Sequence, residues 1–246
     1  MSSPLLVDIY AGDLGGKPDI AKLVDAGMPW CGLLLKATQG DYYSGGSWFQ
    51  KYWPQTKMLA QKAGRYGKDF FRGTYHYFDM RIDAKTQADY FLKYVERAGG
   101  WDVGDLWPMV DVEASGNPGN ITGQQIVDSV STWSSAVELA TGRKPVLYGG
   151  SFLAEHGVTD HCGCQLLIVA RYAATLPAFV YERIGWKVED LYAWQYCGDG
   201  DAHLVAYPSV SPLGKTDISV LTVAKGGQSA IDWTRAHLYA EAPVQT

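Results

Sequence analysis

Asp111 and Glu113 are two carboxylates separated by one residue, and they end an apolar run that begins at Trp107. On a β-strand, side chains at positions i and i+2 leave the same face, about 6.6 Å apart along the chain. Each of two like charges placed in this way raises the pKa of the other, and partial burial raises both further. Cleavage of a glycosidic bond requires a carboxylic acid that stays protonated near neutral pH beside an ionised carboxylate. The spacing therefore predicts an acid pair for this chemistry, the alternative being a strand end whose carboxylates simply meet solvent.

Strands able to position such a pair recur along the chain as eight short apolar segments. They are residues 5–10, 32–38, 73–78, 107–113, 145–149, 166–172, 191–196 and 217–221. Helical patterns separate the first five segments, whereas after the fifth only residues 151–156 suggest a helix. Alternation of strands and helices is typical of parallel βα units. The predicted fold class is α/β, an irregular TIM-like (β/α) barrel of eight strands whose helices are degenerate in the second half.

Two of the predicted helices have clear start signals. Asp83 precedes an apolar stripe at helical spacing and can cap that helix. Thr122 and Gln125 have the spacing of a capping box, and Gly142 follows the apolar positions of the same segment.

In a parallel barrel, functional groups lie at the C-terminal ends of several strands. The polar and aromatic residues at the predicted strand ends, besides the acid pair, are Asp8, Tyr10, Lys36, Tyr75, Tyr77, Tyr148, Arg171, Tyr172, Trp194 and Gln195. Asp217 differs because it begins its segment, so we expect its strand to start earlier or Asp217 to lie on a loop over the barrel mouth. His76 alternates with Tyr75 and Tyr77, and we expect it to pack outward in a structural role.

The composition fits one large domain of 246 residues and excludes several classes of protein. A net charge of -5 argues against binding to nucleic acid or to an anionic membrane through a basic surface. No apolar stretch approaches the ~20 residues that span a bilayer, so we expect no membrane insertion. The N-terminal residues lack the basic and apolar regions of a Sec signal, which predicts synthesis in the cytoplasm and release by another route. We expect a monomer.

The four cysteines do not predict a metal site. Cys31 precedes an apolar run and is expected to be a buried thiol. Cys162 and Cys164 follow two histidines, but Cys-x-Cys does not have the usual zinc spacing. Cys162, Cys164 and Cys197 are left open as thiols or disulfide partners. We expect no metal and no cofactor.

Eight short motifs in the chain also follow the order of a known family. They are Val-Asp-Ile-Tyr at 7–10, Leu-Lys-Ala-Thr-Gln-Gly at 35–40, Gly-Thr-Tyr-His-Tyr-Phe at 73–78, Asp-Val-Glu-Ala-Ser at 111–115, Pro-Val-Leu-Tyr at 145–148, Ile-Val-Ala-Arg-Tyr at 168–172, Trp-Gln-Tyr at 194–196 and Thr-Asp-Ile-Ser at 216–219. Each motif alone is weak, but together they resemble the family 25 glycoside hydrolases, the lysozymes often found as phage endolysins and secreted muramidases. The resemblance departs at Gln39, where the family has Glu, and at Ser219, where it has Asn.

The resemblance implies an irregular barrel, with Glu113 as proton donor and Asp8, Asp111 and Asp217 as supporting acids. It implies a catalytic domain over residues 1–222, with residues 223–246 as an extension packed on the barrel or trailing it. The implied substrate is bacterial peptidoglycan, cut between N-acetylmuramic acid and N-acetylglucosamine after the protein reaches the cell wall. Either a phage lysis enzyme or an antibacterial effector fits this reading.

The identity of the nucleophile is open at this point. The substrate acetamide, oriented by Asp111, can attack the anomeric carbon, or Asp8 or Asp217 can act as nucleophile or base. The aromatic and polar strand-end residues would line the sugar subsites. Arg171 is the first candidate to bind the lactyl carboxylate of muramic acid, and Lys36 is the second.

Two other classes of function are considered. A metal-dependent phosphodiesterase could use the four acids as oxygen ligands, but the strand ends lack paired histidines and a Gly-rich phosphate loop. A non-catalytic glycan-binding barrel would have no need of the acid pair.

Overall fold

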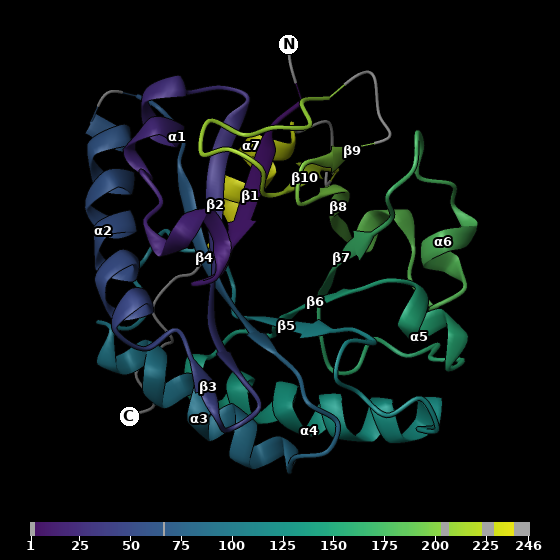
Figure 1. Ribbon diagram of the computed structural model, residues 1–246. Helices are drawn as coiled ribbons and strands as arrows, with labels where there is room; N and C mark the ends of the chain where they lie inside the picture. The colour runs from purple at the N-terminus through teal and green to yellow at the C-terminus, as the bar shows by residue number, and fades with distance from the viewer. Residues whose placement is uncertain (1–2, 66, 203–206, 223–228, 239–246) are drawn as a thin grey trace.

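The chain folds into a closed β-barrel surrounded by helices on part of its circumference (Figure 1). The computed structural model describes residues 3–65, 67–202, 207–222 and 229–238. The barrel strands are β1 (Leu5–Ile9), β2 (Trp30–Gln39), β4 (Phe71–Tyr77), β5 (Met109–Val112), β6 (Val146–Gly149), β7 (Leu166–Ala170), β8 (Leu191–Gly198) and β10 (Asp217–Leu221). β1 pairs with both β2 and β10, and this closes the barrel. Two short strands, β3 (Tyr43–Ser44) and β9 (Asp201–Ala202), pair antiparallel with β2 and β8 respectively.

The last barrel strand runs against its neighbours. β1, β2 and β4 to β8 pair in parallel, whereas β10 is antiparallel to both β8 and β1. The expectation of parallel βα units is therefore wrong for this strand. An antiparallel pair needs no crossover helix, and the described residues between β8 and β10 contain none. The structure also corrects both expectations for Asp217, because the strand does begin there and Asp217 pairs with Asp8 across β1 and β10.

The long helices α2, α3 and α4 all precede β6, and the helices after it are short, as predicted (Figure 1). The helices are α1 (Ala21–Ala26), α2 (Gly46–Arg65), α3 (Ala84–Arg97), α4 (Gly123–Thr141), α5 (Ser151–Glu155), α6 (Phe179–Glu182) and α7 (Ala230–His237), with the 3-10 turns η1 (Asp13–Gly16) and η2 (Val188–Asp190). The Asp83 carboxylate accepts a hydrogen bond of 2.8 Å from the Thr86 amide, and Thr122 with Gln125 forms a capping box, so both predicted helix starts are confirmed.

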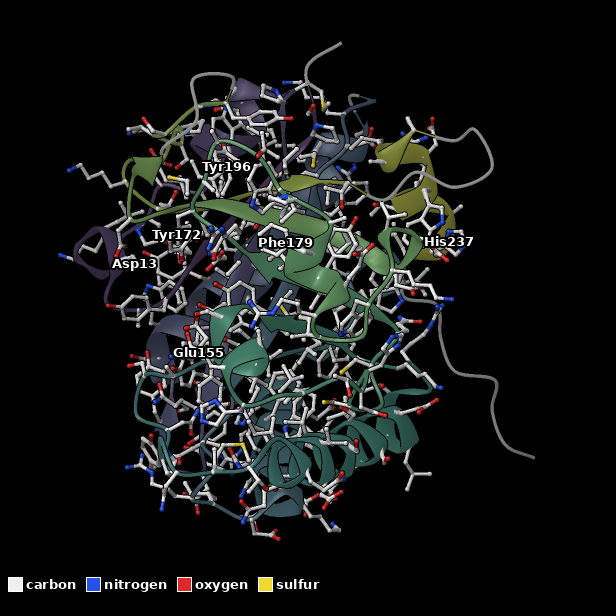
Figure 2. The ribbon with its side chains drawn as sticks, turned by 90° about the vertical axis from the view of Figure 1, so that its right-hand side faces the viewer. Asp13, Glu155, Tyr172, Phe179, Tyr196 and His237 are labelled. Carbon is white, nitrogen blue, oxygen red and sulfur yellow. The ribbon has the colours of Figure 1, made fainter. Side chains whose placement is uncertain are left out.

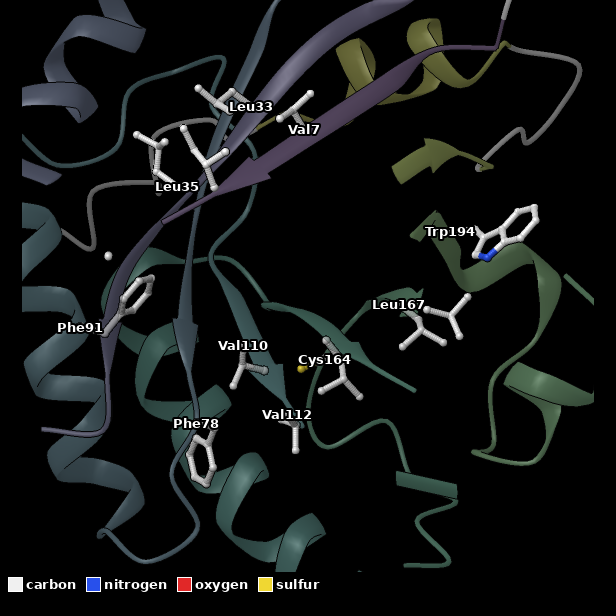
Figure 3. Packing of buried hydrophobic residues seen from close by; sticks show 14 of the residues in the cluster. Val7, Leu33, Leu35, Phe78, Phe91, Val110, Val112, Cys164, Leu167 and Trp194 are labelled. Atoms are coloured by element: carbon white, nitrogen blue, oxygen red, sulfur yellow. The ribbon is translucent and has the colours of Figure 1, made fainter. Parts of the chain in front are cut away.

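Alternation along each strand separates two hydrophobic clusters. The outward-facing side chains, such as Val7, Leu33 and Val110, pack under the helices with Phe91 and other aromatic residues (Figure 3). Burial of each such side chain contributes about 1.5–3 kcal/mol. His76 belongs to this outer layer, where its ring stacks on Trp133 with centroids 5.5 Å apart, and its predicted outward, structural position is confirmed.

The inner cluster fills the barrel at the end where the parallel strands begin. Trp107, which precedes β5, lies with its ring centroid 5.5 Å from that of Tyr192 and 5.9 Å from that of Trp233 on α7. Arg235 on the same helix forms an ion pair of 2.8 Å with Asp69. Residues 229–238 of the expected extension therefore pack on the barrel, whereas residues 223–228 and 239–246 lie outside the described residues.

Among the helices that the structure describes, none combines the length and hydropathy that a bilayer span would need. The four cysteines, Cys31, Cys162, Cys164 and Cys197, are buried free thiols, which confirms the prediction for Cys31.

Candidate active site

The mouth of the barrel holds a cavity of about 190 Å³. Its apolar floor consists of Leu34, Met109 and Ile168, which are inward-facing positions of β2, β5 and β7. The remaining lining residues are Asp8, Tyr10, Lys36, Tyr75, Tyr77, Asp111, Glu113, Tyr148, Tyr172, Gln195, Asp217 and Ser219. Polar side chains thus surround an apolar floor, as expected of a binding site at this end of a barrel.

Three strands bring four carboxylates into this cavity. Asp111 and Glu113 are successive inward positions at the end of β5, because Val112 between them faces the outer cluster. Asp8 comes from β1, and Asp217 is the first residue of β10. The antiparallel direction of β10 is what places its first residue at the same mouth as the last residues of the parallel strands.

Asp111 is the most enclosed of the four acids by exposed area, with 7% of its surface exposed. Its Oδ1 is buried and has no hydrogen-bond partner among the residues that the structure describes. Burial raises the pKa of Asp111 well above its ordinary value, and the Glu113 carboxylate adds to this rise while Lys36 opposes it. An unpartnered buried carboxyl oxygen is costly, and a ligand that donates a hydrogen bond would relieve that cost.

Glu113 is partly exposed, so that it can reach both a bound ligand and water. Burial raises the pKa of Glu113, whereas the neighbouring Tyr148 hydroxyl and the Lys36 charge lower it. A raised pKa keeps a larger fraction of the carboxyl protonated near neutral pH, which a general acid needs.

Asp8 and Asp217 face each other across β1 and β10. Burial raises the pKa of Asp8 well above its ordinary value, and the charge of Asp217 is the next contribution. Burial also raises the pKa of Asp217 to about 6, even though the Asp199 amide donates a hydrogen bond of 2.8 Å to its Oδ1. The amide of Gln195 donates to Asp8 Oδ2 over 3.3 Å and holds that side chain in place.

Lys36 introduces a cation among these acids. Its Nζ donates a hydrogen bond of 2.8 Å to Oε1 of Gln39 and lies 4.4 Å from the ring centroid of Tyr77. Burial lowers the pKa of Lys36, and the charges of Asp111 and Glu113 oppose this effect. Gln39, the departure from the family motif, is therefore a neutral partner for the lysine where a glutamate would be an anionic one.

A hydrogen-bond network at Gln195 connects the two sides of the mouth. Its Oε1 accepts a short hydrogen bond from the Tyr148 hydroxyl and another of 3.1 Å from the Tyr172 hydroxyl. Its amide group binds Asp8, so Gln195 fixes an acid and two tyrosines together. Tyr77 is anchored separately, by a hydrogen bond of 2.7 Å from its hydroxyl to the Ser115 carbonyl.

The structure separates two residues from the set predicted at the mouth. Trp194 is 7% exposed, packs in the outer cluster and donates from Nε1 to the Arg171 carbonyl over 2.7 Å, so the prediction that it lines the cavity is wrong. Arg171 lies outside the catalytic cavity and lines an adjoining groove. The other predicted residues, which all line the cavity, are Asp8, Tyr10, Lys36, Tyr75, Tyr77, Asp111, Glu113, Tyr148, Tyr172, Gln195 and Asp217.

The adjoining groove has a volume of about 630 Å³ and shares Glu113 and Tyr172 with the cavity. Tyr172, Phe179 and Glu155 lie on the face of the molecule over which it opens (Figure 2). The other lining residues are Val112, Ala114, Ser115, Gly150, Ser151, Phe152, Ala154, Ala170, Arg171, Val180 and Arg183. The site is therefore a cavity with an open groove on the Glu113 side.

Asp13 at the rim of the mouth was not found from the sequence. It lies in η1, accepts a hydrogen bond of 2.9 Å from the Tyr10 amide, and adds its charge to those acting on Asp8 and Lys36. Burial raises its own pKa. No strand pattern marks a residue in a short turn. An acid in a glycine-containing segment such as Asp-Leu-Gly-Gly is also typical of an ordinary loop.

Comparison with known proteins gives consistent matches. The sequence profile described as "Glycosyl hydrolases family 25" matches residues 8–203. The Escherichia coli K12 protein described as "Uncharacterized protein YegX" is 31% identical over 181 residues, which are 74% of this chain and 58% of that protein. The chain thus spans less than two thirds of the length of this curated relative.

Two solved structures illustrate the likeness in fold. A muramidase from Trichobolus zukalii has a TM-score of 0.67 and 21% identity, with 91% of this chain and 95% of that chain covered. A bacterial lysozyme from Streptomyces coelicolor has a TM-score of 0.65 and 22% identity, with 92% and 94% covered. At these identities the two structures show a shared barrel fold.

Proposed function

The chain belongs to the glycosyl hydrolases of family 25, and from this membership we propose that it is an N-acetylmuramidase. Its substrate is bacterial peptidoglycan, and the bond cleaved is the β-1,4 bond between N-acetylmuramic acid and N-acetylglucosamine. The observation that carries the proposal is the pair of carboxyl groups at the end of β5, Asp111 and Glu113, which both line the cavity and each have a pKa raised by burial.

Glu113 is the general acid in this proposal. It is the one member of the pair that borders both the cavity and the groove, so a sugar chain passing between them would present its glycosidic oxygen to this carboxyl. Protonation of that oxygen lets the leaving sugar depart as an alcohol while positive charge develops at the anomeric carbon.

Asp111 orients the acetamide group of the sugar in the cavity. Its unpartnered Oδ1 can accept a hydrogen bond from the acetamide N–H, which directs the acetamide oxygen toward the anomeric carbon. Asp8 and Asp217 are then left to activate the water that completes hydrolysis, and the pKa of about 6 for Asp217 lies in the range that suits a base. The competing assignment makes Asp8 or Asp217 the nucleophile.

Lys36 disfavours the phosphodiesterase alternative. Its partly buried ammonium group interacts with Asp111, Glu113 and Asp8, and so it supplies positive charge among the carboxylates that would have to bind a divalent cation. A glycan-binding barrel without catalysis would leave the raised pKa of Glu113 without a use.

The protein acts on the wall after its release, as a phage lysis enzyme or as an antibacterial effector, and it works as a monomer. The flanking genes would distinguish these two roles.

The bond assignment is tested by digesting purified peptidoglycan, reducing the products with borohydride and analysing them by mass spectrometry. Cleavage on the reducing side of muramic acid gives muramitol at the new ends. Glucosaminitol in its place would refute the bond assignment, and the absence of new reducing ends would refute the activity. Glu113→Gln protein from the same preparation controls for contaminating hydrolases.

A further inference from the structure

The groove beside the catalytic cavity is larger than the cavity itself, with about 630 Å³ against about 190 Å³. It begins at Glu113 and Tyr172, which border both spaces, and continues between α5 and α6. A ligand bound in the cavity can therefore extend past Glu113 into the groove. Because a general acid protonates the leaving oxygen, the far side of Glu113 is where the leaving part of the substrate lies.

The groove presents two arginines that are available to a ligand. Arg171 follows β7 and Arg183 follows α6, and both are exposed. Neither guanidinium group forms an ion pair or hydrogen bond with the residues that the structure describes. Arg72, Arg81 and Arg235, by contrast, each pair with an aspartate. The groove thus holds cationic groups in a protein of net charge -5.

The groove has only one acidic side chain, Glu155, besides Glu113 at its boundary, among the residues that line it. Glu155 is an exposed carboxylate at the end of α5, and Glu113 lies at the boundary with the cavity. Since Glu113 acts in its protonated form, two cations face one fixed anion. This balance favours an anionic ligand.

The remaining wall is apolar. Phe179 on α6, which Figure 2 labels on the face turned to the viewer, leaves 54% of its surface exposed. Val180 and Ala154 line the groove beside it. An exposed phenylalanine in a concave site is typical of a surface that packs against apolar groups of a ligand. The groove therefore offers apolar contacts and guanidinium groups in the same space.

We propose that this groove binds the peptide stem of the muramoyl residue that follows the departing N-acetylglucosamine on the leaving side of the cleaved bond, with Arg171 and Arg183 holding carboxylates of that stem. The inference rests on the proposed function, because it takes the leaving side from the role of Glu113. A peptide rich in alanine supplies small apolar side chains for the wall and free carboxylates for the two guanidinium groups, which can bind them in bidentate geometry. A neutral sugar chain would use neither cation.

The test compares two substrates prepared from the same peptidoglycan, glycan strands with intact stems and strands from which an amidase has removed the stems. The second substrate keeps a free lactyl carboxylate on each muramic acid, so it separates stem recognition from lactyl recognition. The measured quantity is the ratio of kcat/KM on intact strands to kcat/KM on stripped strands. We expect the double variant Arg171→Gln, Arg183→Gln to lower this ratio about tenfold, as expected for loss of charge-assisted hydrogen bonds.

Matched variants sharpen the result. Arg183→Gln alone should lower the ratio by a smaller factor, and Glu155→Gln should raise it because the groove loses its fixed anion. Arg97→Gln, an exposed arginine on α3 outside both spaces, should leave the ratio unchanged. Circular dichroism and the melting temperature establish that each variant is folded.

An unchanged ratio in the double variant would overturn the proposal, and so would an equal loss on both substrates, which would point to the sugar chain or the lactyl group. Absence of cleavage by the wild-type protein would be a failure of the proposed function instead. Calorimetric titration of Glu113→Gln protein with a soluble stem pentapeptide then tests separately whether the groove binds the stem. Binding that disappears when both arginines are replaced supports the inference, and no binding overturns it.

Discussion

Asp8 and Asp217 are register partners on the antiparallel strands β1 and β10, although they come from near opposite ends of the chain. Opposed carboxylates on neighbouring strands repel each other, and this repulsion adds to the effect of burial on the pKa of Asp8. The pairing places a base candidate on the opposite side of the cavity from the acid pair of β5. The barrel closes at the same two strands, so one pair of strands both closes the barrel and supplies two of the four acids.

Glu113→Gln should remove hydrolysis while the fold stays unchanged. The amide has nearly the same shape but cannot donate the required proton, and loss of a general acid costs at least the typical 10²–10⁴-fold in rate. Release of reducing ends from purified peptidoglycan measures the effect, with Glu96→Gln on the exposed side of α3 as the control. A Glu113→Gln protein with a tenth of the wild-type rate would exclude this residue as the acid.

Lys36→Met should move the pH profile of kcat/KM to higher pH. The lysine charge lowers the pKa of both Asp111 and Glu113, so its removal raises both. The active form has one carboxyl of this pair ionised and the other protonated, so the two limbs of the profile belong to the pair, and both then shift upward by on the order of 1 pH unit. Lys93→Met on α3 is the control, and a profile that stays in place or moves downward would contradict the assigned role of Lys36.

Gln39→Glu should shift the profile in the same direction and by less. The new carboxylate pairs with Lys36 Nζ, now 2.8 Å from Gln39 Oε1, and offsets part of its field on the acids. The substitution also removes the hydrogen bond from Gln39 to the Tyr42 hydroxyl, so Tyr42→Phe is the matched control. Because the fields of separate charges add, a shift of similar size is expected in a Lys36→Met background, and a Gln39→Glu profile that stays in place or moves downward would contradict the prediction.

Asp217→Asn should stabilise the fold at neutral pH. The pKa of Asp217 is about 6 in the folded protein and roughly 3.9 in an unfolded chain, so the folded state holds its proton more tightly. The stability that this group contributes is fully present below about pH 4 and is lost as the pH rises through 6. Relative to wild type, the variant should gain on the order of 1–2 kcal/mol in unfolding free energy between pH 4 and pH 7, after allowance for solvent screening.

Urea unfolding at the two pH values measures this difference. The exposed Asp25→Asn on α1 serves as the control for loss of a surface charge. A wild-type protein whose stability rises between pH 4 and pH 7 by more than that of the Asp217→Asn protein would reverse the sign and contradict the assignment.

Activity should survive both EDTA and dithiothreitol. Acid catalysis by carboxylates needs no metal. The four cysteines are buried free thiols, so there is no disulfide for dithiothreitol to reduce. The measurement is the hydrolysis rate before and after each treatment. Loss of activity in EDTA, restored by stoichiometric zinc or magnesium, would favour a metal-dependent enzyme instead.

Much of the fold could be predicted because the barrel strands carry apolar side chains outward, and the parallel ones lead into polar or aromatic residues at the mouth. The eight strand segments, the two capped helices and the short helices in the second half of the barrel are all confirmed. The direction of β10 could not be predicted, since the apolar pattern of a five-residue strand does not indicate whether the strand runs parallel or antiparallel to its neighbours. That reversal is why Asp217 did not fit the strand-end rule.

The set of cavity residues was predicted well where the alternation of strands was respected. Tyr75 with Tyr77, and Asp111 with Glu113, are two apart and share a face. Trp194 and Gln195, like Arg171 and Tyr172, are adjacent, so both members of such a pair cannot face the cavity on a regular strand. Gln195 and Tyr172 line it, whereas Trp194 and Arg171 do not.

The contact of Trp233 with Trp107 and Tyr192 bears on how the protein could be immobilised or fused to another domain. This contact holds α7 over the end of the barrel where the parallel strands begin, while the acids lie at the other end. A solid support or a carrier protein attached to the exposed side of α7 itself would lie at the end of the barrel opposite the mouth. A substrate could then still approach the four carboxylates at the mouth.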